Sequence, residues 1–322
     1  MNVKTIGVLT SGGDAPGMNA AVRAVVRTAL SKGMRVKGIY RGYNGLIEDE
    51  VFDMNIRSVS DIIHRGGTVL FTARSPRFKE EEGMQTAINT CKKHGIDGIV
   101  CIGGDGTYRG ARDLSERGIP CVGVPGTIDN DISSTEYSIG FDTAVNTCKE
   151  MVDRLRDTAQ SHERCTIVEV MGRGAGYLAL HSGIACGATT ILVPEVEFDV
   201  EKDIIDRIYR AKNTGKKHFI IVVAEGIGGV EKLSKQIQAV TGIDSRATIL
   251  GHVQRGGSPS VRDRVCASEM GYAAVDLLSQ GIGNRVVAYQ HGELVDIDIF
   301  EALKMEKPFE YKLYEIANTI NN

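Results

Sequence analysis

The stretch Gly98-Ile99-Val100-Cys101-Ile102-Gly103-Gly104-Asp105-Gly106-Thr107 decides the fold. Its first half is an apolar run typical of a buried parallel strand, and its second half is a glycine-rich loop with one carboxylate. A second apolar run, residues 121–124, ends in Pro125-Gly126-Thr127-Ile128-Asp129-Asn130-Asp131. Open α/β sheets bind ligands in loops at the carboxyl ends of their strands. Both loops are therefore expected at the ligand-binding end of the sheet, where the strands have their carboxyl ends.

Strand-like and helix-like segments alternate along most of the 322 residues, a pattern typical of parallel sheets flanked by helices. The clearest helix follows the first strand, where apolar residues recur at three- and four-residue spacing over residues 18–29. The length favours about two domains. A pattern of strand, glycine-rich turn and helix at residues 9–26 occurs again at residues 168–185. This repetition would be expected if the chain had two similarly built halves. The expected strands are 5–10, 36–40, 98–102, 121–124, 166–170, 190–193, 218–224, 248–250 and 286–289.

Composition excludes several classes of function. The net charge of −3 gives no general attraction to nucleic acid or to an anionic membrane. The seven cysteines are scattered through apolar runs, which indicates reduced core thiols and neither a disulfide framework nor a zinc site. The sequence enters a strand without a signal-peptide pattern, and no apolar run approaches the length of a membrane span. We expect a cytoplasmic protein.

The turn Ser11-Gly12-Gly13-Asp14-Ala15-Pro16-Gly17 joins the first strand to its helix. Adjacent glycines and a helix start offer free backbone N–H groups to an anion. The alternative is a tight strand-to-helix turn in which Asp14 caps the helix. The turn lacks both the Lys-Ser/Thr ending of a P-loop and the spacing of a dinucleotide fingerprint.

Three aspartates suggest metal and proton chemistry. Asp105 lies between glycines after a strand, where it can reach a nucleotide-bound Mg²⁺. Asp129 and Asp131 are two apart and face the same way in an extended chain, so their repulsion indicates a cation or a shared proton. One carboxylate would then lie near Mg²⁺ while the other accepts a hydroxyl proton. An Asx-rich surface turn would give the same composition.

Six basic residues occupy loop positions: Arg74, Arg164, Arg173, Arg246, His252 and Arg255. Taken singly, each arginine is better explained as a solvated surface charge. Arg173 and the pair His252 and Arg255 nevertheless follow expected strands, and the planar fork of arginine binds phosphate. Two phosphorylated substrates would account for so many arginines in an acidic protein.

Six segments resemble motifs of the bacterial ATP-dependent 6-phosphofructokinases: residues 11–16, 103–107, 125–131, 171–173, 194–198 and 251–259. The resemblance covers essentially the whole chain. It implies two Rossmann-like three-layer α/β/α domains with mostly parallel sheets and an active site in the cleft between them. The larger, ATP-binding domain would comprise 1–140 with 253–304, and the smaller, fructose 6-phosphate-binding domain would comprise 141–252 with 305–322. The implied reaction moves the γ-phosphoryl group of ATP to the 1-hydroxyl of fructose 6-phosphate, the committed step of glycolysis.

The resemblance also implies roles for individual residues. Asp129 would be the general base, Thr127 would lie beside the transferring phosphoryl group, and Arg173 would stabilise its charge. Asp105 would serve Mg²⁺. The residues implied for ATP are Gly13, Arg74, Ser75, Gly104, Asp105, Gly106 and Thr107. Those implied for the sugar phosphate are Thr127, Ile128, Asp129, Arg164, Met171, Gly172, Arg173, Glu225, Arg246, His252, Val253, Gln254 and Arg255. Arg164 and Arg246 would come from a neighbouring subunit of a homotetramer.

A second subunit interface in the resembling enzymes binds ADP as activator and phosphoenolpyruvate as inhibitor. The matching positions here are Arg23, Arg27, Arg156, Gly187, Thr189, Lys216, Lys217 and His218. Thr189 replaces a glutamate that helps to hold the effector's metal, and Thr214 and Ile56 stand where basic residues are common. The strength and sign of control are therefore left open. Arg23 and Arg27 also fit the solvated face of a helix.

Three alternatives remain. Pyrophosphate-dependent relatives carry Asp at position 106 and Lys at 126, and the glycines found here favour ATP. Kinases of NAD or lipids with a Gly-Gly-Asp-Gly loop lack the run at 125–131. A non-catalytic nucleotide sensor of the same fold would need neither Asp129 nor Arg173.

Overall fold

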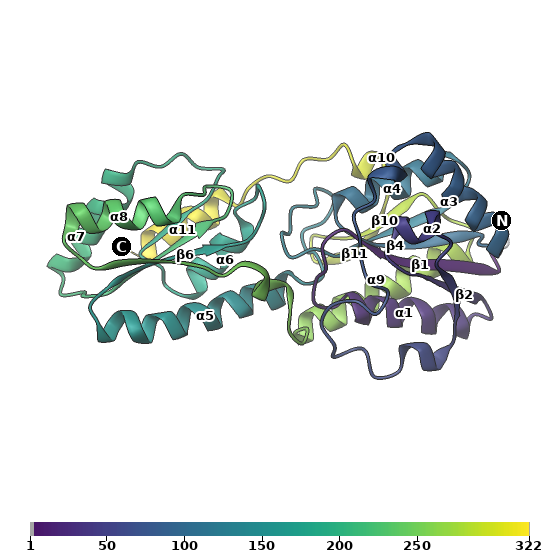
Figure 1. The fold of residues 1–322 in the computed structure, drawn as a ribbon, viewed down its shortest axis with the longest axis horizontal. Helices are drawn as coiled ribbons and strands as arrows, with labels where there is room; N and C mark the ends of the chain where they lie inside the picture. Colours follow the sequence, from purple (N-terminus) through teal and green to yellow (C-terminus); the bar gives the residue numbers. More distant parts are fainter. Residues whose placement is uncertain (1–2, 322) are drawn as a thin grey trace. The chain divides into compact units, whose positions relative to one another are not determined.

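Two β-sheets organise the chain, one in each of two units (Figure 1). The computed structural model describes residues 3–321. Unit 1 comprises the chain up to Ile128, Ile132–Thr143 and Arg255–Lys307, and unit 2 comprises Asp129–Asp131, Ala144–Gln254 and the chain from Pro308 onward. Asp129–Asp131 thus group with unit 2, whereas the sequence analysis assigned them to the first domain. The ligand expected for each domain stays a prediction.

The sheet of unit 1 has the strand order β11-β10-β5-β4-β1-β2-β3. Its five inner strands pair in parallel, which confirms the mostly parallel α/β fold expected from the alternating pattern. The two edge strands, β3 and β11, are antiparallel to their neighbours. The strands are β1 (Thr5–Ser11), β2 (Arg35–Ile39), β3 (Val51–Met54), β4 (Gly98–Gly103), β5 (Cys121–Pro125), β10 (Arg285–Gln290) and β11 (Glu293–Asp298).

The sequence analysis missed both of these edge strands. β3 reads VFDM and β11 reads ELVDID, and most of their residues are half-buried or exposed. An edge strand can carry charged side chains because only one side of its backbone is paired. Neither segment therefore forms the apolar run that identified the buried strands.

Helices cover both faces of this sheet. α1 (Met18–Ser31) and α9 (Val261–Ser279) pack on one face, where a Cβ on Gly271 would lie 2.8 Å from the Cβ of Ala24 (Figure 1). The apolar stripe expected over residues 18–29 is confirmed, because its residues are fully buried. The other helices are α2 (Tyr43–Ile47), η1 (Ile56–Val59), η2 (Pro76–Lys79), α3 (Glu81–His94), α4 (Asp105–Glu116) and α10 (Ile299–Ala302).

Unit 2 is built around a four-stranded parallel sheet with the order β7-β8-β6-β9. Its strands are β6 (Cys165–Val170), β7 (Thr190–Leu192), β8 (Phe219–Ala224) and β9 (Ser245–Ile249). β9 begins three residues before the expected strand at 248–250, and as a partly exposed edge strand it lacks a clear apolar run. Its helical segments are α6 (Tyr177–Ala185), η3 (Glu201–Ile205), α7 (Asp206–Asn213), α8 (Val230–Thr241) and α11 (Tyr311–Ile320). Most of α5 (Phe141–Ser161) and of η4 (Gly251–Arg255) also belongs to unit 2, whereas residues 141–143 and Arg255 belong to unit 1.

The cysteines lie mostly in the protein interior, as expected. All seven are free thiols and six are buried. Among the helices of residues 3–321, none combines the length and apolar character that crossing a membrane requires.

Asp263 ties the segment after the 125–131 loop to α9 within unit 1. Its side chain is fully buried and accepts hydrogen bonds from the backbone N–H groups of Gly140 (2.7 Å) and Thr143 (2.8 Å). The hydroxyls of Tyr137 and Thr143 donate to the same carboxylate. Burial raises the pKa of Asp263, while these hydrogen bonds oppose that rise. The carboxylate is therefore a buried acceptor on which four donors depend.

Replacing Asp263 with alanine should lower the free energy of unfolding by about 3 kcal/mol or more, because each buried donor left without an acceptor costs about 1–3 kcal/mol. Urea-induced unfolding followed by circular dichroism measures the change. Asp276→Ala on the same helix is the control, since its ion pair with Lys32 is partly exposed and should contribute under about 1 kcal/mol. Equal losses in the two variants would contradict this role for Asp263.

Candidate active site

Three glycine-containing loops follow three adjacent strands of unit 1. β1 lies between β4 and β2, and β4 lies between β1 and β5. The chain leaves β1 for β2 and β3, then crosses to the other side of β1 to form β4, so the strand order reverses there. Such a switch point opens a crevice at the carboxyl ends of the strands. Ser11 pairs with Gly103, and Gly103 pairs with Pro125, so the three loops start at the same level.

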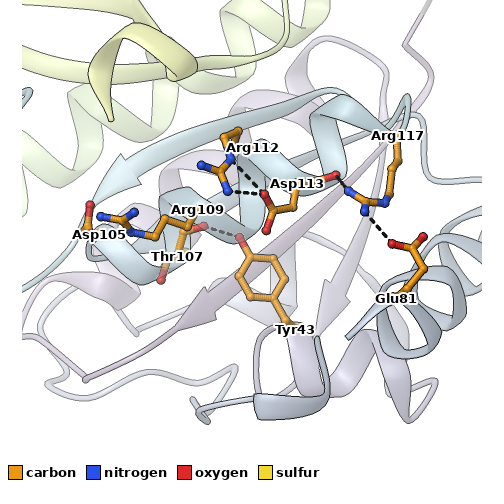
Figure 2. Close-up of polar contacts among 8 residues, drawn as sticks. All are labelled: Tyr43, Glu81, Asp105, Thr107, Arg109, Arg112, Asp113 and Arg117. Carbon is orange, nitrogen blue, oxygen red and sulfur yellow. Dashed lines mark hydrogen bonds and ion pairs between the residues drawn. The ribbon is translucent and has the colours of Figure 1, made fainter. Parts of the chain in front are cut away.

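Hydrogen bonds fasten these loops to one another. The hydroxyl of Thr107 donates to the carbonyl of Ser11 (3.0 Å), and the N–H of Gly126 donates to the carbonyl of Gly103 (3.0 Å). The hydroxyl of Tyr43 donates to the carbonyl of Thr107 at 2.5 Å (Figure 2). The first turn of α4 is therefore fixed from both sides.

The first loop and the start of α4 leave backbone N–H groups for an anion. Gly12 has a φ of 88°, a conformation that other residues rarely adopt. Neither α1 nor α4 has a side-chain hydrogen bond at its N-cap, and the N-cap residues are Gly17 and Gly104. The alternative in which Asp14 caps α1 is therefore wrong. A Cβ on Gly106 would meet no atom within 4 Å, so the space beside it is open.

Asp105 is the first residue of α4, and its carboxylate is paired with Arg109 (Nε–Oδ2 2.9 Å; Figure 2). The two side chains are 44% and 57% exposed, so this pair is weak and leaves the carboxylate accessible. Within residues 3–321 no three or more His, Cys, Asp or Glu side chains are grouped to hold a metal ion. Mg²⁺ needs only one or two protein carboxylates when phosphates and water complete its shell. Asp105 therefore fits a nucleotide-bound Mg²⁺.

Two further expected ATP residues lie before η2. Arg74 is exposed. Ser75 is the N-cap residue of η2, and its buried hydroxyl has no hydrogen-bond partner in the structure.

Arg255 lies against the first loop of unit 1. Its Nη1 donates to the carbonyl of Asp14 (3.0 Å), and a Cβ on Gly13 would lie 2.6 Å from the same atom. The sequence analysis grouped Arg255 with His252, which is exposed and belongs to unit 2. The contact with Asp14 was not expected, since it joins residues 241 positions apart.

The 125–131 loop is not extended. Asn130 has a φ of 52°, and Asp129 and Asn130 are buried. The expectation that Asp129 and Asp131 face the same way in an extended chain is therefore wrong, because the residue between them turns the backbone. The alternative of an exposed Asx-rich turn is also wrong for the buried Asp129. Thr127 is buried too, and its N–H donates to the carbonyl of Ile139 (3.1 Å).

The loop after β6 carries Met171, Gly172 and Arg173. The Arg173 side chain is exposed, and its backbone N–H donates to Oε1 of Glu225 (2.5 Å), which follows β8. Gln254 is fully buried, and its amide oxygen accepts from the N–H of Met171 (3.1 Å). The neighbouring Val253 is exposed.

Arg164 and Arg246 share one carboxylate. Oδ2 of Asp244 accepts from Nε of Arg164 at 2.6 Å, and its Oδ1 lies 3.2 Å from Nε of Arg246. Parallel pairing of β6 with β9 places Arg246 opposite Thr166, so both arginines lie at the amino ends of two neighbouring strands. Unit 2 thus brings together two arginines that lie 82 positions apart in the sequence.

Several of the residues expected at an effector site lie close together in unit 2. The Nζ of Lys216 donates to the hydroxyl of the buried Thr189 (3.2 Å), and Arg156 donates to the carbonyl of Cys186. Burial, followed by the charge of Arg156, lowers the pKa of Lys216.

Of the remaining expected effector residues, one lies near this cluster and the others lie elsewhere. Burial, with Arg156 and Lys216, lowers the pKa of His218, so this histidine belongs to the same positive field. Lys217 pairs instead with Glu163 (2.7 Å). Gly187 is exposed beyond the end of α6. Arg23 and Arg27 are on α1 in unit 1, where Arg27 is exposed.

Comparison with known families agrees with this geometry. The model of the family described as phosphofructokinase matches residues 5–278. The chain belongs to the phosphofructokinase family.

Curated phosphofructokinases resemble the chain over its full length. Two named "ATP-dependent 6-phosphofructokinase", from Clostridium botulinum (strain Loch Maree) and Clostridium acetobutylicum, are 54% and 55% identical, and each match covers 99% of this chain and 100% of the relative.

Solved phosphofructokinase structures share the fold. The enzyme of Saccharomyces cerevisiae matches with a TM-score of 0.90 and 33% identity, covering 98% of this chain and 50% of that one. A pyrophosphate-dependent enzyme from Marinobacter aquaeolei has a TM-score of 0.85 at 23% identity, covering 96% of this chain and 86% of that one, and shows the fold alone.

Sequence reasoning missed three acidic residues that hold parts of this chain in place. Asp244 holds the two arginines, Asp263 holds the segment after the 125–131 loop, and Glu195 accepts a hydrogen bond from the N–H of Gly176 (2.8 Å). Of the three, only Glu195 could have been found from the sequence, because it lies in the segment 194–198 that resembles a motif of the family. The contacts of the other two join distant parts of the chain.

Proposed function

We propose that this chain catalyses the ATP-dependent phosphorylation of fructose 6-phosphate at its 1-hydroxyl, giving fructose 1,6-bisphosphate and ADP. The observation that carries the proposal is the set of three loops at the switch point of unit 1, with Asp105 at a helix start and an open Gly106 beside it. The full-length relatives named "ATP-dependent 6-phosphofructokinase" support it. The reaction is a step of glycolysis, and we place it in the cytoplasm.

Asp129 is the proposed general base. Its carboxylate takes the proton from the 1-hydroxyl as that oxygen forms a bond to the γ-phosphorus, and the bond to the β-phosphate oxygen breaks. Thr127 lies beside the transferring phosphoryl group, and the guanidinium of Arg173 stabilises its negative charge. The burial of Asp129 supports this role, because a base shielded from water keeps a fixed position.

ATP is assigned to the loops of unit 1. Backbone N–H groups of Gly13 and residues 104–106 bind phosphate oxygens, assisted by the positive end of the α4 dipole. Thr107, whose N–H donates to the carbonyl of Gly104 (2.9 Å), lines the same site. Arg74 and Ser75 contact the nucleotide, and the unpaired hydroxyl of Ser75 supports this assignment. Asp105 would hold Mg²⁺, which when bound neutralises phosphate charge.

The sugar phosphate is assigned to unit 2 together with residues 127–129 and Arg255. Met171, Gly172 and Arg173 shape the site, and Glu225 accepts from a sugar hydroxyl. His252, Val253, Gln254 and Arg255 belong to the loop that binds the 6-phosphate. Arg164 and Arg246 act on the site of a neighbouring copy in a homotetramer. The ion pairs of both arginines with Asp244 support a common role.

An effector site is assigned to Arg156, Gly187, Thr189, Lys216, Lys217 and His218, with Arg23 and Arg27 supplied across a subunit interface. Its basic cluster fits the phosphates of ADP or phosphoenolpyruvate. The hydroxyl of Thr189 is engaged by Lys216, and Thr189 offers no charge to an effector's metal. We therefore expect an anion site whose affinity depends little on Mg²⁺.

A coupled assay with ATP, Mg²⁺ and fructose 6-phosphate tests the function. The rate with ATP should exceed the rate with pyrophosphate by a wide margin, and repeating it with ADP and phosphoenolpyruvate reports the effector site. A pyrophosphate rate equal to or above the ATP rate would overturn the choice of donor. Absence of turnover with either donor would favour the nucleotide sensor.

A further inference from the structure

Three side chains from different loops hold the backbone of residues 171–176, which follows β6. Oε1 of Gln254 accepts from the N–H of Met171 (3.1 Å), and Oε1 of Glu225 accepts from that of Arg173 (2.5 Å). Oε1 of Glu195 accepts from the N–H of Gly176 (2.8 Å). Glu195, Glu225 and Gln254 follow β7, β8 and β9 respectively. Each of the other three strands of the sheet thus sends one acceptor to this loop.

The loop needs such support because its backbone is strained. Arg173 has a φ of 55°, in the left-handed region that residues with a Cβ rarely adopt. Such conformations cost about 1–3 kcal/mol and persist only where the surroundings impose them. The three acceptors bind at the start, middle and end of the segment and supply that constraint.

Glu195 is fitted closely to the end of this loop. Its Oε2 is buried with no hydrogen-bond partner in the structure, and a Cβ on Gly176 would lie 2.6 Å from it. Glycine at position 176 leaves room for this carboxylate and for Val193, whose Cβ would lie 2.5 Å from an added Cβ. Gly176 is also the N-cap residue of the nine-residue helix α6, where a negative charge is favourable. An acceptor held at this point fixes where the loop ends and the helix begins.

We propose that Glu195 is a positioning residue for Arg173. By accepting from the N–H of Gly176 it maintains the left-handed turn from which the Arg173 guanidinium projects. Glu195 itself touches neither substrate. The inference rests on the proposed function, in which Arg173 stabilises the transferring phosphoryl group.

A double-mutant cycle tests the proposal in the full-length protein. Glu195→Ala should lower kcat by about 10- to 100-fold, since small misplacement of a catalytic group has effects of that size. KM for ATP should hardly change. Glu195→Gln keeps an acceptor oxygen and should recover most of kcat. The double variant with Arg173→Ala should be no slower than Arg173→Ala alone, because Glu195 acts through Arg173. Glu197→Ala, an exposed carboxylate in the same segment, is the matched control.

Hydrogen exchange gives a second readout that does not depend on turnover. Peptides covering residues 171–180 should exchange faster in Glu195→Ala than in the wild type, whereas Glu195→Gln and Glu197→Ala should match the wild type. Unchanged exchange in Glu195→Ala would overturn the proposal, as would wild-type kcat in that variant or multiplicative losses in the double variant. A wild-type protein that phosphorylates no fructose 6-phosphate would instead overturn the proposed function, and exchange would still decide whether Glu195 holds the loop.

Discussion

Replacing Asp129 with asparagine should lower kcat by about 10²- to 10⁴-fold, the range that a positioned general base contributes. Asparagine keeps the size of the side chain but cannot take the proton from the 1-hydroxyl. KM for ATP and for fructose 6-phosphate should stay near the wild-type values, because binding precedes the proton transfer. Steady-state kinetics in the coupled assay measure both quantities.

Asp157→Asn is the control for this variant, since it neutralises an exposed carboxylate of unit 2 outside the proposed site. Its kcat should equal that of the wild type. If Asp129→Asn raised KM and left kcat unchanged, Asp129 would be a binding residue and the assignment of the base would be wrong.

Replacing Gly106 with aspartate should lower kcat/KM for ATP by at least about 100-fold, as the loss of 2.7 kcal/mol or more of interaction would do. The new carboxylate would enter the open space beside Asp105, where the proposed nucleotide phosphates also carry negative charge. Stability should not fall, because no atom lies within 4 Å of the added Cβ and an acidic residue is favourable in the first turn of α4. Thermal unfolding and ATP kinetics together separate the two effects.

Gly106→Ala distinguishes charge from size at the same position. It adds a methyl group without a charge and should cost far less ATP activity than the aspartate. Equal losses in the two variants would mean that crowding alone is responsible. Full ATP activity in Gly106→Asp would mean that the nucleotide phosphates bind elsewhere.

Buried strands and the loops that follow them were the most predictable part of the fold. β4 is fully buried and apolar up to Gly103, so both its extent and the polar loop after it are visible in the sequence. The edge strands β3 and β11 were not predictable in the same way, because half-exposed strands tolerate charged residues and lose the apolar pattern. A local stretch of sequence shows that a strand is buried on both faces. It does not show that a half-exposed segment pairs as a strand at the edge of a sheet.

The contacts that support the site were less predictable than the residues in it. Asp244 binds Arg164 across 80 positions, and Asp263 binds Tyr137 across 126. A lone aspartate gives no local sign of such a partner, since the fold brings the two together. The left-handed Asn130 also escaped prediction, and with it the turn that separates Asp129 from Asp131.

Single-turnover phosphoryl transfer in Asp129→Asn tests the central claim most directly. Enzyme in excess over labelled ATP is mixed rapidly with fructose 6-phosphate and quenched, so that the chemical step is observed without product release. We predict that the rate constant for forming fructose 1,6-bisphosphate falls by the same factor as kcat. Transfer at the wild-type rate would contradict the claim that Asp129 accepts the proton.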